Sequence, residues 1–263
     1  MGVRSPSYQA GFYAPERGGR PAYPQAWRGC VGQHSPLLGP SGVTLHDWSG
    51  LKNHGSFTGM SPSTAWVTDS TGLWGLKLGI SDGVESVNAS MLTSPELTVS
   101  YWMRMSAYST FGAVLRNDSS YFQLFNNTGA YVAGGYVETT NTSWADNTLR
   151  CVTFVNDGVN NQRKVYANGV QVGVYPDSAV YPVAKVTGTL IGYTGTNWQP
   201  RATFFEVTSS NRAWTDKDVA IYSRRPGMMH ELAARKFYSI ASSVSATIFR
   251  RSLSQRIGSR GVQ

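Results

Sequence analysis

Short segments in which apolar and polar side chains alternate follow one another from Gly42 onward. In "LTVSYWMRM", every second residue from Leu97 to Met105 is apolar or aromatic. Successive side chains of a strand point to opposite faces, so this period of two predicts a strand with one face on a core. The other face is expected to meet water or a partner.

Turn residues separate the expected strands. Asn168-Gly169 lies between two alternating runs and supplies the two positive-φ residues of a type I′ hairpin. Thr215, with acids at 216 and 218, has the form of a helix N-cap, and Arg225-Pro226-Gly227 ends the short helix that follows. We expect strands at 73–78, 97–105, 112–116, 121–125, 130–137, 149–155, 163–167, 170–175, 189–193 and 202–207.

The size of the chain favours one all-β domain. Its 263 residues are 41% hydrophobic, enough for one sizeable core, and all-β domains often reach such lengths as single units. We place this domain at residues 41–223.

The first 40 residues read as an extended arm. Six prolines there remove hydrogen-bond donors and fix φ, which prevents a long regular element. Aromatic residues, among them Tyr13, Tyr23 and Trp27, are frequent for a solvated linker. We therefore expect this arm, residues 1–40, to lie on a partner surface.

The other end of the chain is strongly basic. Residues 222–263 hold eight arginine or lysine residues against one glutamate, among them Arg224, Arg225, Arg250 and Arg251, whereas the middle of the chain is nearly neutral. Arginine here is interleaved with aromatic and aliphatic residues, which favours a protein partner over nucleic acid. Residues 224–263 are therefore predicted to be a basic arm that docks on its own domain or on a neighbour.

Two cysteines, Cys30 and Cys151, are too few for a disulfide framework and lack metal-ligand spacing. Buried thiols are the favoured interpretation, with one bridge as the alternative. No signal peptide opens the chain, and no apolar run is long enough to span a bilayer.

A set of blocks in order along residues 27–222 resembles the concanavalin A-like lectin/glucanase superfamily, in its laminin-G-like branch. The blocks are "GVTLHDWSGLKNHGSFTGM", "WGLKLGISDGVESV", "LTVSYWMRM", "LRCVTFVNDG", "KVYANGVQVG", "TLIGY" and "TFFEVTSSNRAWTDKDVAIYS". The resemblance implies a two-sheet antiparallel jelly-roll sandwich. The opening of the chain is similar to versions encoded by tailed phages, prophages and marine bacteria.

Catalysis is not expected. Retaining glucanases of this superfamily carry two carboxylates on one strand in a Glu-x-Asp-x-x-Glu pattern, which is absent here. The four histidines accompany no Gly-x-Ser-x-Gly elbow and have no zinc-type spacing.

The loop "LHDWSGLKNHGSFTGM" has two interpretations. Asp47 and Asn53 match positions near the ion in some calcium-binding relatives, and Glu206 lies on a late strand expected nearby. The alternative, which we favour, is that Asp47 and Asn53 bond their own backbone in a turn. Calcium is therefore the cofactor to test.

Sugar binding needs exposed aromatic rings beside polar side chains. Tyr131, Trp144, Tyr193 and Trp198 lie near loop-like segments, although core or interface packing is the commoner role of aromatic residues in a sandwich.

Two functions follow from these patterns. The first is a non-catalytic structural protein of a phage virion, a capsid decoration or a head- or tail-associated component, oligomeric or lattice-bound, whose arms bind capsid subunits or other virion proteins. The alternative is a carbohydrate-binding module, calcium-dependent or not, that attaches to a host surface outside the cell.

Overall fold

The computed structural model describes residues 8–9, 12–13, 21–79, 82–86, 94–108, 112–117, 120–125, 129–133, 135–140, 143–177, 188–192 and 200–231. All of them belong to one compact unit, Met1–Ala233. Within the described part of the chain, no helix has the length and apolar character needed to cross a membrane.

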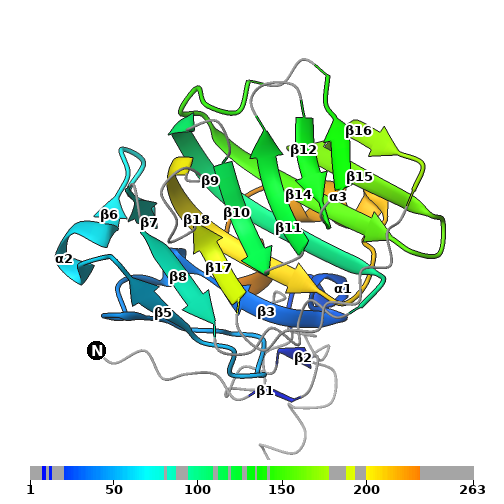
Figure 1. The fold of residues 1–263 in the computed structure, drawn as a ribbon. Coiled ribbons are helices and arrows are strands. Elements are labelled where there is room, and N and C mark those ends of the chain that lie inside the picture. Colours follow the sequence, from blue (N-terminus) through cyan, green and yellow to red (C-terminus); the bar gives the residue numbers. More distant parts are fainter. Residues whose placement is uncertain are drawn as a thin grey trace, which may run out of the picture. The chain divides into compact units, whose positions relative to one another are not determined.

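Two eight-stranded antiparallel sheets form a jelly-roll sandwich, as the sequence predicts (Figure 1). The first sheet has the order β13 (Gly135–Glu138), β12 (Gly129–Val132), β11 (Ser120–Phe125), β10 (Gly112–Asn117), β17 (Gly188–Gly192), β8 (Gly83–Ser86), β5 (Gly55–Thr58), β4 (Thr44–Leu45). The second has the order β16 (Val170–Tyr175), β15 (Gln162–Ala167), β14 (Leu149–Asp157), β9 (Leu97–Tyr108), β18 (Pro200–Ser210), β7 (Trp74–Leu78), β6 (Trp66–Thr68), with β3 (Cys30–His34) also paired to β18.

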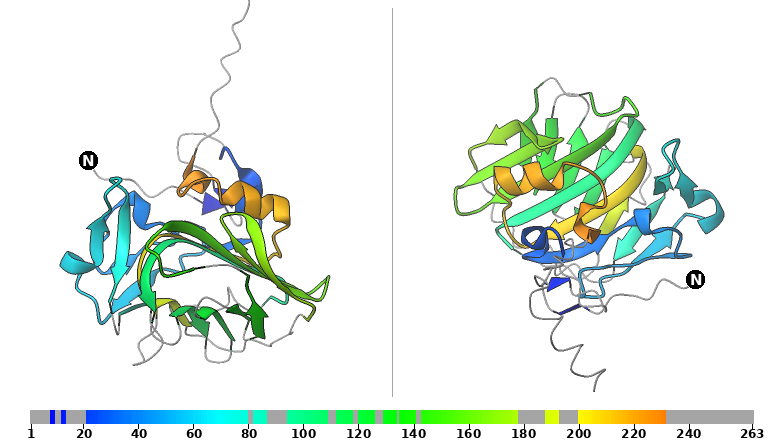
Figure 2. Two further views of the ribbon diagram at one scale, coloured as in Figure 1. Left: turned by 90° about the horizontal axis from the view of Figure 1, so that it is seen from above. Right: turned by 180° about the vertical axis from the view of Figure 1, so that it is seen from behind.

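Helical segments lie outside the sheets. They are α1 (Pro24–Trp27), η1 (Pro36–Leu38), α2 (Pro62–Ala65), α3 (Asp216–Tyr222) and η3 (Met228–His230). In Figure 2, α3 crosses the outer face of the second sheet. No described helix covers the outer face of the first sheet, which is turned toward the viewer in Figure 1.

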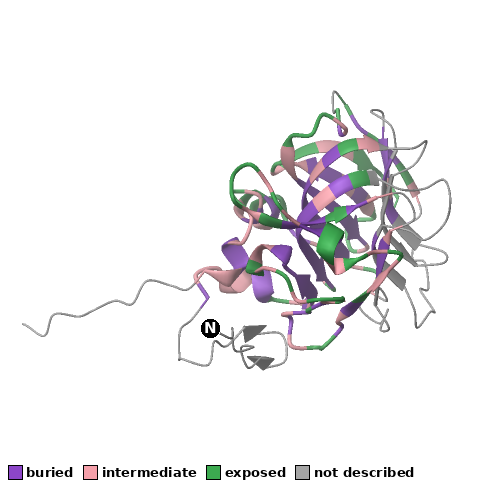
Figure 3. Cartoon of the chain, turned by 90° about the vertical axis from the view of Figure 1, so that its left-hand side faces the viewer, coloured by how far each residue is buried: buried purple, intermediate pink, exposed green. Residues whose placement is uncertain are grey.

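The central strands of the second sheet, β9, β14 and β18, are buried on both faces. Tyr101 and Phe204 belong to the core between the sheets, whereas their chain neighbours Trp102 and Phe205 belong to a second cluster on the outer face. Trp102 is only 5% exposed, so the face expected to be wetter is covered instead. Figure 3 shows buried residues both inside the sandwich and in the helical segments packed on it.

The predicted N-terminal arm does not extend to residue 40. β3 pairs with β18 from Val207 to Ser210, and the Trp27 ring is 1% exposed in the second cluster. The Nε1–H of Trp27 donates to the Met229 carbonyl at 2.8 Å. Tyr23 packs partly buried against the same cluster, so both residues expected on a partner surface contribute to the fold itself.

The structure describes some of the other residues that were predicted to bind a partner. Tyr8–Gln9 (β1) pairs with Phe12–Tyr13 (β2), but the Tyr13 side chain lies outside the described part of the chain. Arg224 is exposed, and Arg225 forms an ion pair with Glu231 at 2.6 Å. Residues 250 and 251 lie outside the described residues. The predicted C-terminal arm, 224–263, therefore begins within the fold, because Met228 and Met229 are buried.

Candidate functional site

A pair of tyrosines, one half-buried and one exposed, lies on the outer face of the first sheet. Tyr131 of β12 and Tyr136 of β13 are cross-strand partners. Their neighbours Ala130, Val132 and Val137 are fully buried, so alternation places both tyrosines on the opposite, outer face. The ring centroids are 5.5 Å apart with planes at 66°, and Tyr136 is 38% exposed.

A glycine sets the orientation of the Tyr136 ring. A Cβ built on Gly129 would lie 2.4 Å from the Tyr136 hydroxyl oxygen and 2.5 Å from two ring carbons. The ring therefore lies down over Gly129, in space that any other residue would fill. The hydroxyl end of the ring covers this glycine, and 38% of the residue stays exposed.

Glu138 completes this arrangement. It is exposed, pairs with Gly129 across the hairpin, and follows Tyr136 by two residues, so both side chains share the outer face. A carboxylate accepts hydrogen bonds only and holds two hydroxyl groups well. We call Tyr131, Tyr136 and Glu138 the tyrosine platform.

Four aromatic residues were predicted to stack on a sugar. Of these, Tyr131 lies on the outer face of the first sheet. Trp144 was wrongly expected there, because its ring is 2% exposed in the core between the sheets and offers no free face. Residues 193 and 198 lie outside the described residues. Tyr136 was missed because 130–137 reads as one strand, whereas a turn at Ala133, with φ of 49°, divides it into a hairpin.

The loop of residues 45–60, for which the sequence allowed a turn or a calcium site, forms a turn around Asp47. One Asp47 oxygen accepts from the backbone N–H of Gln33 at 2.8 Å and of Ser49 at 2.9 Å. The other accepts from the Ser49 hydroxyl at 2.7 Å and from the backbone N–H of Asn53 at 2.9 Å. Each of these four bonds uses lone-pair capacity that a cation needs, so the geometry favours the turn.

The other two expected calcium ligands also have internal partners. The side-chain nitrogen of Asn53 donates to the Val31 carbonyl at 2.8 Å, whereas its Oδ1, the atom that could bind a cation, is buried without a hydrogen-bond partner in the part of the chain that the structure describes. Glu206 is 0% exposed and accepts from the Gln33 side chain at 2.6 Å and from the backbone N–H of Gly227 at 2.7 Å. Among the described residues, no group of three or more His, Cys, Asp or Glu side chains fits a metal ion. Calcium binding stays a prediction.

Both cysteines are free and buried, so the alternative of a bridge between them is wrong. Burial raises the pKa of the Cys151 thiol to about 12 and raises that of Cys30 further. Neither thiol is a nucleophile at neutral pH.

A sequence profile of the concanavalin A-like lectin/glucanases superfamily matches residues 78–220, more than half of the chain. The chain belongs to this superfamily. The two curved antiparallel sheets of this concanavalin A-like domain agree with the assignment. No curated protein matches the chain significantly in sequence.

Solved structures share the concanavalin A-like fold. Domain 4 of AbnA, an extracellular arabinanase from Geobacillus stearothermophilus solved with arabinotriose, is 16% identical with a TM-score of 0.56, covering 73% of this chain and 97% of that domain. The binding domain of Paraclostridial Mosquitocidal Protein 1 is 14% identical with a TM-score of 0.54, covering 74% and 52%.

A third structure, of botulinum neurotoxin type C, is titled for cell entry that depends on two ganglioside molecules. It is 15% identical with a TM-score of 0.54, covering 74% of this chain and 50% of that one. The chain thus spans about half the length of the two toxin structures. At these identities the likeness shows the fold alone.

Proposed function

We propose that this concanavalin A-like domain is a non-catalytic carbohydrate-binding module that holds a sugar ring on the tyrosine platform. The observation that carries the proposal is the Tyr136 ring, which lies over Gly129 on the outer face of the sheet and leaves the residue 38% exposed. The apolar C–H face of a sugar ring stacks on such a surface, while the carboxylate of Glu138 accepts hydrogen bonds from hydroxyl groups at its edge.

The comparisons support the same ligand class. The family description names lectins, and two of the three solved structures are titled for a sugar ligand or for gangliosides. The arabinanase is titled as extracellular, which supports placing the activity of this chain outside the cell.

The alternative of a phage structural protein has weaker support. None of the three solved structures described above is a virion protein. Trp27 and Tyr23, expected to bind a neighbouring subunit, pack within the domain instead.

A glycan array tests the proposal with the full chain and three variants. Tyr136→Ala removes the aromatic ring. Gly129→Ala keeps the ring but displaces it from the strand, because the added methyl group takes its space. We expect both to weaken binding of the same set of glycans about tenfold or more, equal to about 1.4 kcal/mol. Thermal unfolding of each variant separates lost binding from lost folding.

The matched control is Tyr175→Ala, because Tyr175 is 46% exposed on β16 of the other sheet. It should bind as the unchanged chain does. Binding should also persist in a chelator, since Asp47 already bonds four protein donors. The proposal is overturned if the unchanged chain binds no glycan, or if no glycan signal depends on Tyr136 and Gly129.

A further inference from the structure

A concave feature, separate from the tyrosine platform, lies on the outer face of the second sheet. It is a hollow of about 510 Å³ between the β14–β15 turn and residues 213–217, which lead into α3. Its size is within the range of small-molecule sites. Its lining combines Val159, Ala213, Trp214 and Thr215 with carboxylate, amide and ammonium groups: Glu96, Asp157, Asn160, Lys164, Asp216 and Lys217. We call it the polar hollow after these charged and amide groups.

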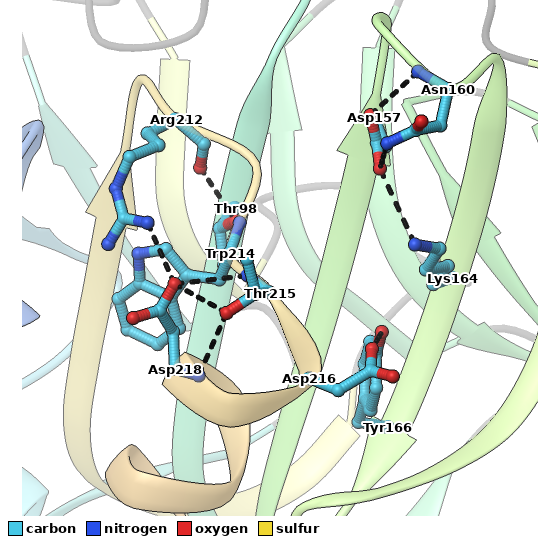
Figure 4. A network of polar contacts seen from close by, with 10 residues as sticks. All are labelled: Thr98, Asp157, Asn160, Lys164, Tyr166, Arg212, Trp214, Thr215, Asp216 and Asp218. Carbon is cyan, nitrogen blue, oxygen red and sulfur yellow. Dashed lines mark hydrogen bonds and ion pairs between the residues drawn. The ribbon is translucent and has the colours of Figure 1, made fainter.

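One wall is fixed by Asp157 (Figure 4). Its carboxylate accepts from the backbone and side-chain N–H groups of Asn160, at 3.0 and 2.8 Å, and pairs with Lys164 at 3.4 Å. Burial alone would raise the pKa of Asp157, but the bonds from Asn160 and Lys164 lower it below its ordinary value. The turn, its amide and its ammonium group are therefore held in one arrangement.

The opposite wall is fixed by hydrogen bonds around α3. Thr215 and Asp218 form a capping box, and Arg212 pairs with Asp218 at 2.8 Å (Figure 4). The Thr98 hydroxyl donates to the Arg212 carbonyl at 2.8 Å and accepts from the backbone N–H of Trp214 at 2.9 Å. Both walls are thus built before any ligand arrives, which lowers the entropy cost of binding.

Several polar groups in the polar hollow keep hydrogen-bonding capacity. One oxygen of Asp216 accepts from the hydroxyl of buried Tyr166 at 2.7 Å, which orients the carboxylate and leaves the other oxygen available. Within the described part of the chain, the Glu96 and Lys217 side chains make no hydrogen bond or ion pair. Hydrogen-bond acceptors and a donor therefore line the same hollow.

We infer that the polar hollow is a second sugar-binding site, which holds a neutral or amino sugar edge-on through hydrogen bonds. A sugar hydroxyl donates to a carboxylate and accepts from an ammonium group at once, and this hollow offers both. Trp214 is 2% exposed, so its ring offers no stacking face. Three carboxylates against two ammonium groups leave a net negative charge, which disfavours sugars that carry a carboxylate.

This inference takes its ligand class from the proposed function but depends on different residues. The test is a titration of the full-length Tyr136→Ala variant, followed by two-dimensional NMR of backbone amides and of the Trp214 indole. The probes are methyl glucoside, glucosamine and glucuronic acid. We expect the first two to shift signals of 213–217 and the third to shift them at least tenfold less at equal concentration.

Adding Lys217→Ala or Glu96→Gln to the Tyr136→Ala variant should weaken these shifts about tenfold. The control is Lys77→Ala, at an exposed lysine of β7, which should leave the shifts unchanged. The inference is overturned if no probe shifts the NMR signals of residues 213–217, or if Lys217→Ala and Glu96→Gln leave those shifts unchanged. Platform binding is read separately, from the array signals that Tyr136→Ala removes. Loss of either site is therefore distinguishable from loss of the other.

Discussion

The carboxyl group of Glu206 is fully buried and accepts hydrogen bonds from the Gln33 side chain and the backbone N–H of Gly227. Gln33 determines its surroundings. The Gln33 carbonyl accepts from the Thr208 hydroxyl, so its amide is free to donate to Glu206 at 2.6 Å and to Nε2 of His230 at 3.3 Å. With the Thr208 proton directed at Gln33, the Tyr222 hydroxyl donates to Thr208 at 2.9 Å. The buried amide of Gln33 thus aligns four other polar groups.

Burial raises the pKa of Glu206 from 4.5 to about 7, against the lowering effect of its bonds from Gly227 and Gln33. The folded protein keeps a proton that the unfolded chain loses between these values. The stabilising contribution is therefore complete below pH 4.5, falls as the pH rises, and is lost above pH 7. At 1.36 kcal/mol for each pH unit, the loss is about 3 kcal/mol.

Glu206→Gln should remove this dependence. Between pH 4.5 and pH 7.5 the free energy of unfolding of the unchanged protein should fall by about 3 kcal/mol relative to that of the variant. Urea denaturation at several pH values measures the difference. Desolvation lowers the pKa of His230 to about 4, so this histidine destabilises below pH 6.5, but its effect cancels between the two proteins. Parallel curves for the two proteins would contradict the prediction.

Single residues also mark the limit of what the sequence predicts. Asp47 could be assigned to a turn or to a cation, since both use the same oxygens, and only the positions of Gln33 and Asn53 favour the turn. Trp144 lies in a loop-like segment, but its burial depends on strands far away in sequence. The orientation of Tyr136 depends on its register with Gly129, which alternation alone does not give.

At the scale of elements, alternation and turn residues predicted the middle of the chain well. β16 has the predicted bounds, and Asn168 and Gly169 have φ of 48° and 84°, as a type I′ turn requires. Thr215 caps α3 as expected. β3 and α1 were missed because both are short and lie among prolines, where pairing with β18 provides the stabilisation that local sequence does not.

A close approach between β13 and β16 joins the ends of the two sheets. A Cβ on Gly173 would lie 2.5 Å from the backbone oxygen of Glu138 and 2.9 Å from a Val137 methyl carbon. The backbone of Thr140 donates to the Val172 carbonyl at 3.0 Å beside this contact. The edge strand β16 is thereby partly covered, although Val174 and Tyr175 remain exposed.

Gly173→Ala should destabilise the protein by about 1–3 kcal/mol, because the nearest atom belongs to the backbone and cannot rotate away. Urea denaturation gives the change in free energy of unfolding. Gln171→Ala, an exposed position on the same strand, serves as the control and should stay within about 0.5 kcal/mol. An unchanged or increased stability of Gly173→Ala would show that the two strands separate at little cost.

At the scale of the whole molecule, the second sheet lies between two apolar clusters, and distant parts of the chain make up the outer one. Trp27 comes from near the start of the described chain and Met229 from near its end, 202 positions apart. Their contact encloses Trp102 and Phe205 of the sheet. We therefore expect the outer cluster and the sandwich to unfold together.

Met229→Ala tests this expectation. The side chain is 0% exposed, and its removal should lower the free energy of unfolding by about 2–5 kcal/mol. Circular dichroism of the sheets and the NMR signal of the Trp27 indole N–H in the outer cluster should still report one common transition. Leu51→Ala, at a side chain that is 45% exposed, should have a much smaller effect. An earlier transition seen by the Trp27 indole alone would mean that the outer cluster is a separate unit.

The two enclosed thiols give the molecule a practical property. Cys30 and Cys151 are buried and hold their protons at neutral pH, so a maleimide dye should not label them in the folded protein. A single cysteine introduced beside Glu138 would then carry the fluorophore alone, in the native background, and report directly on anything that settles over the neighbouring ring.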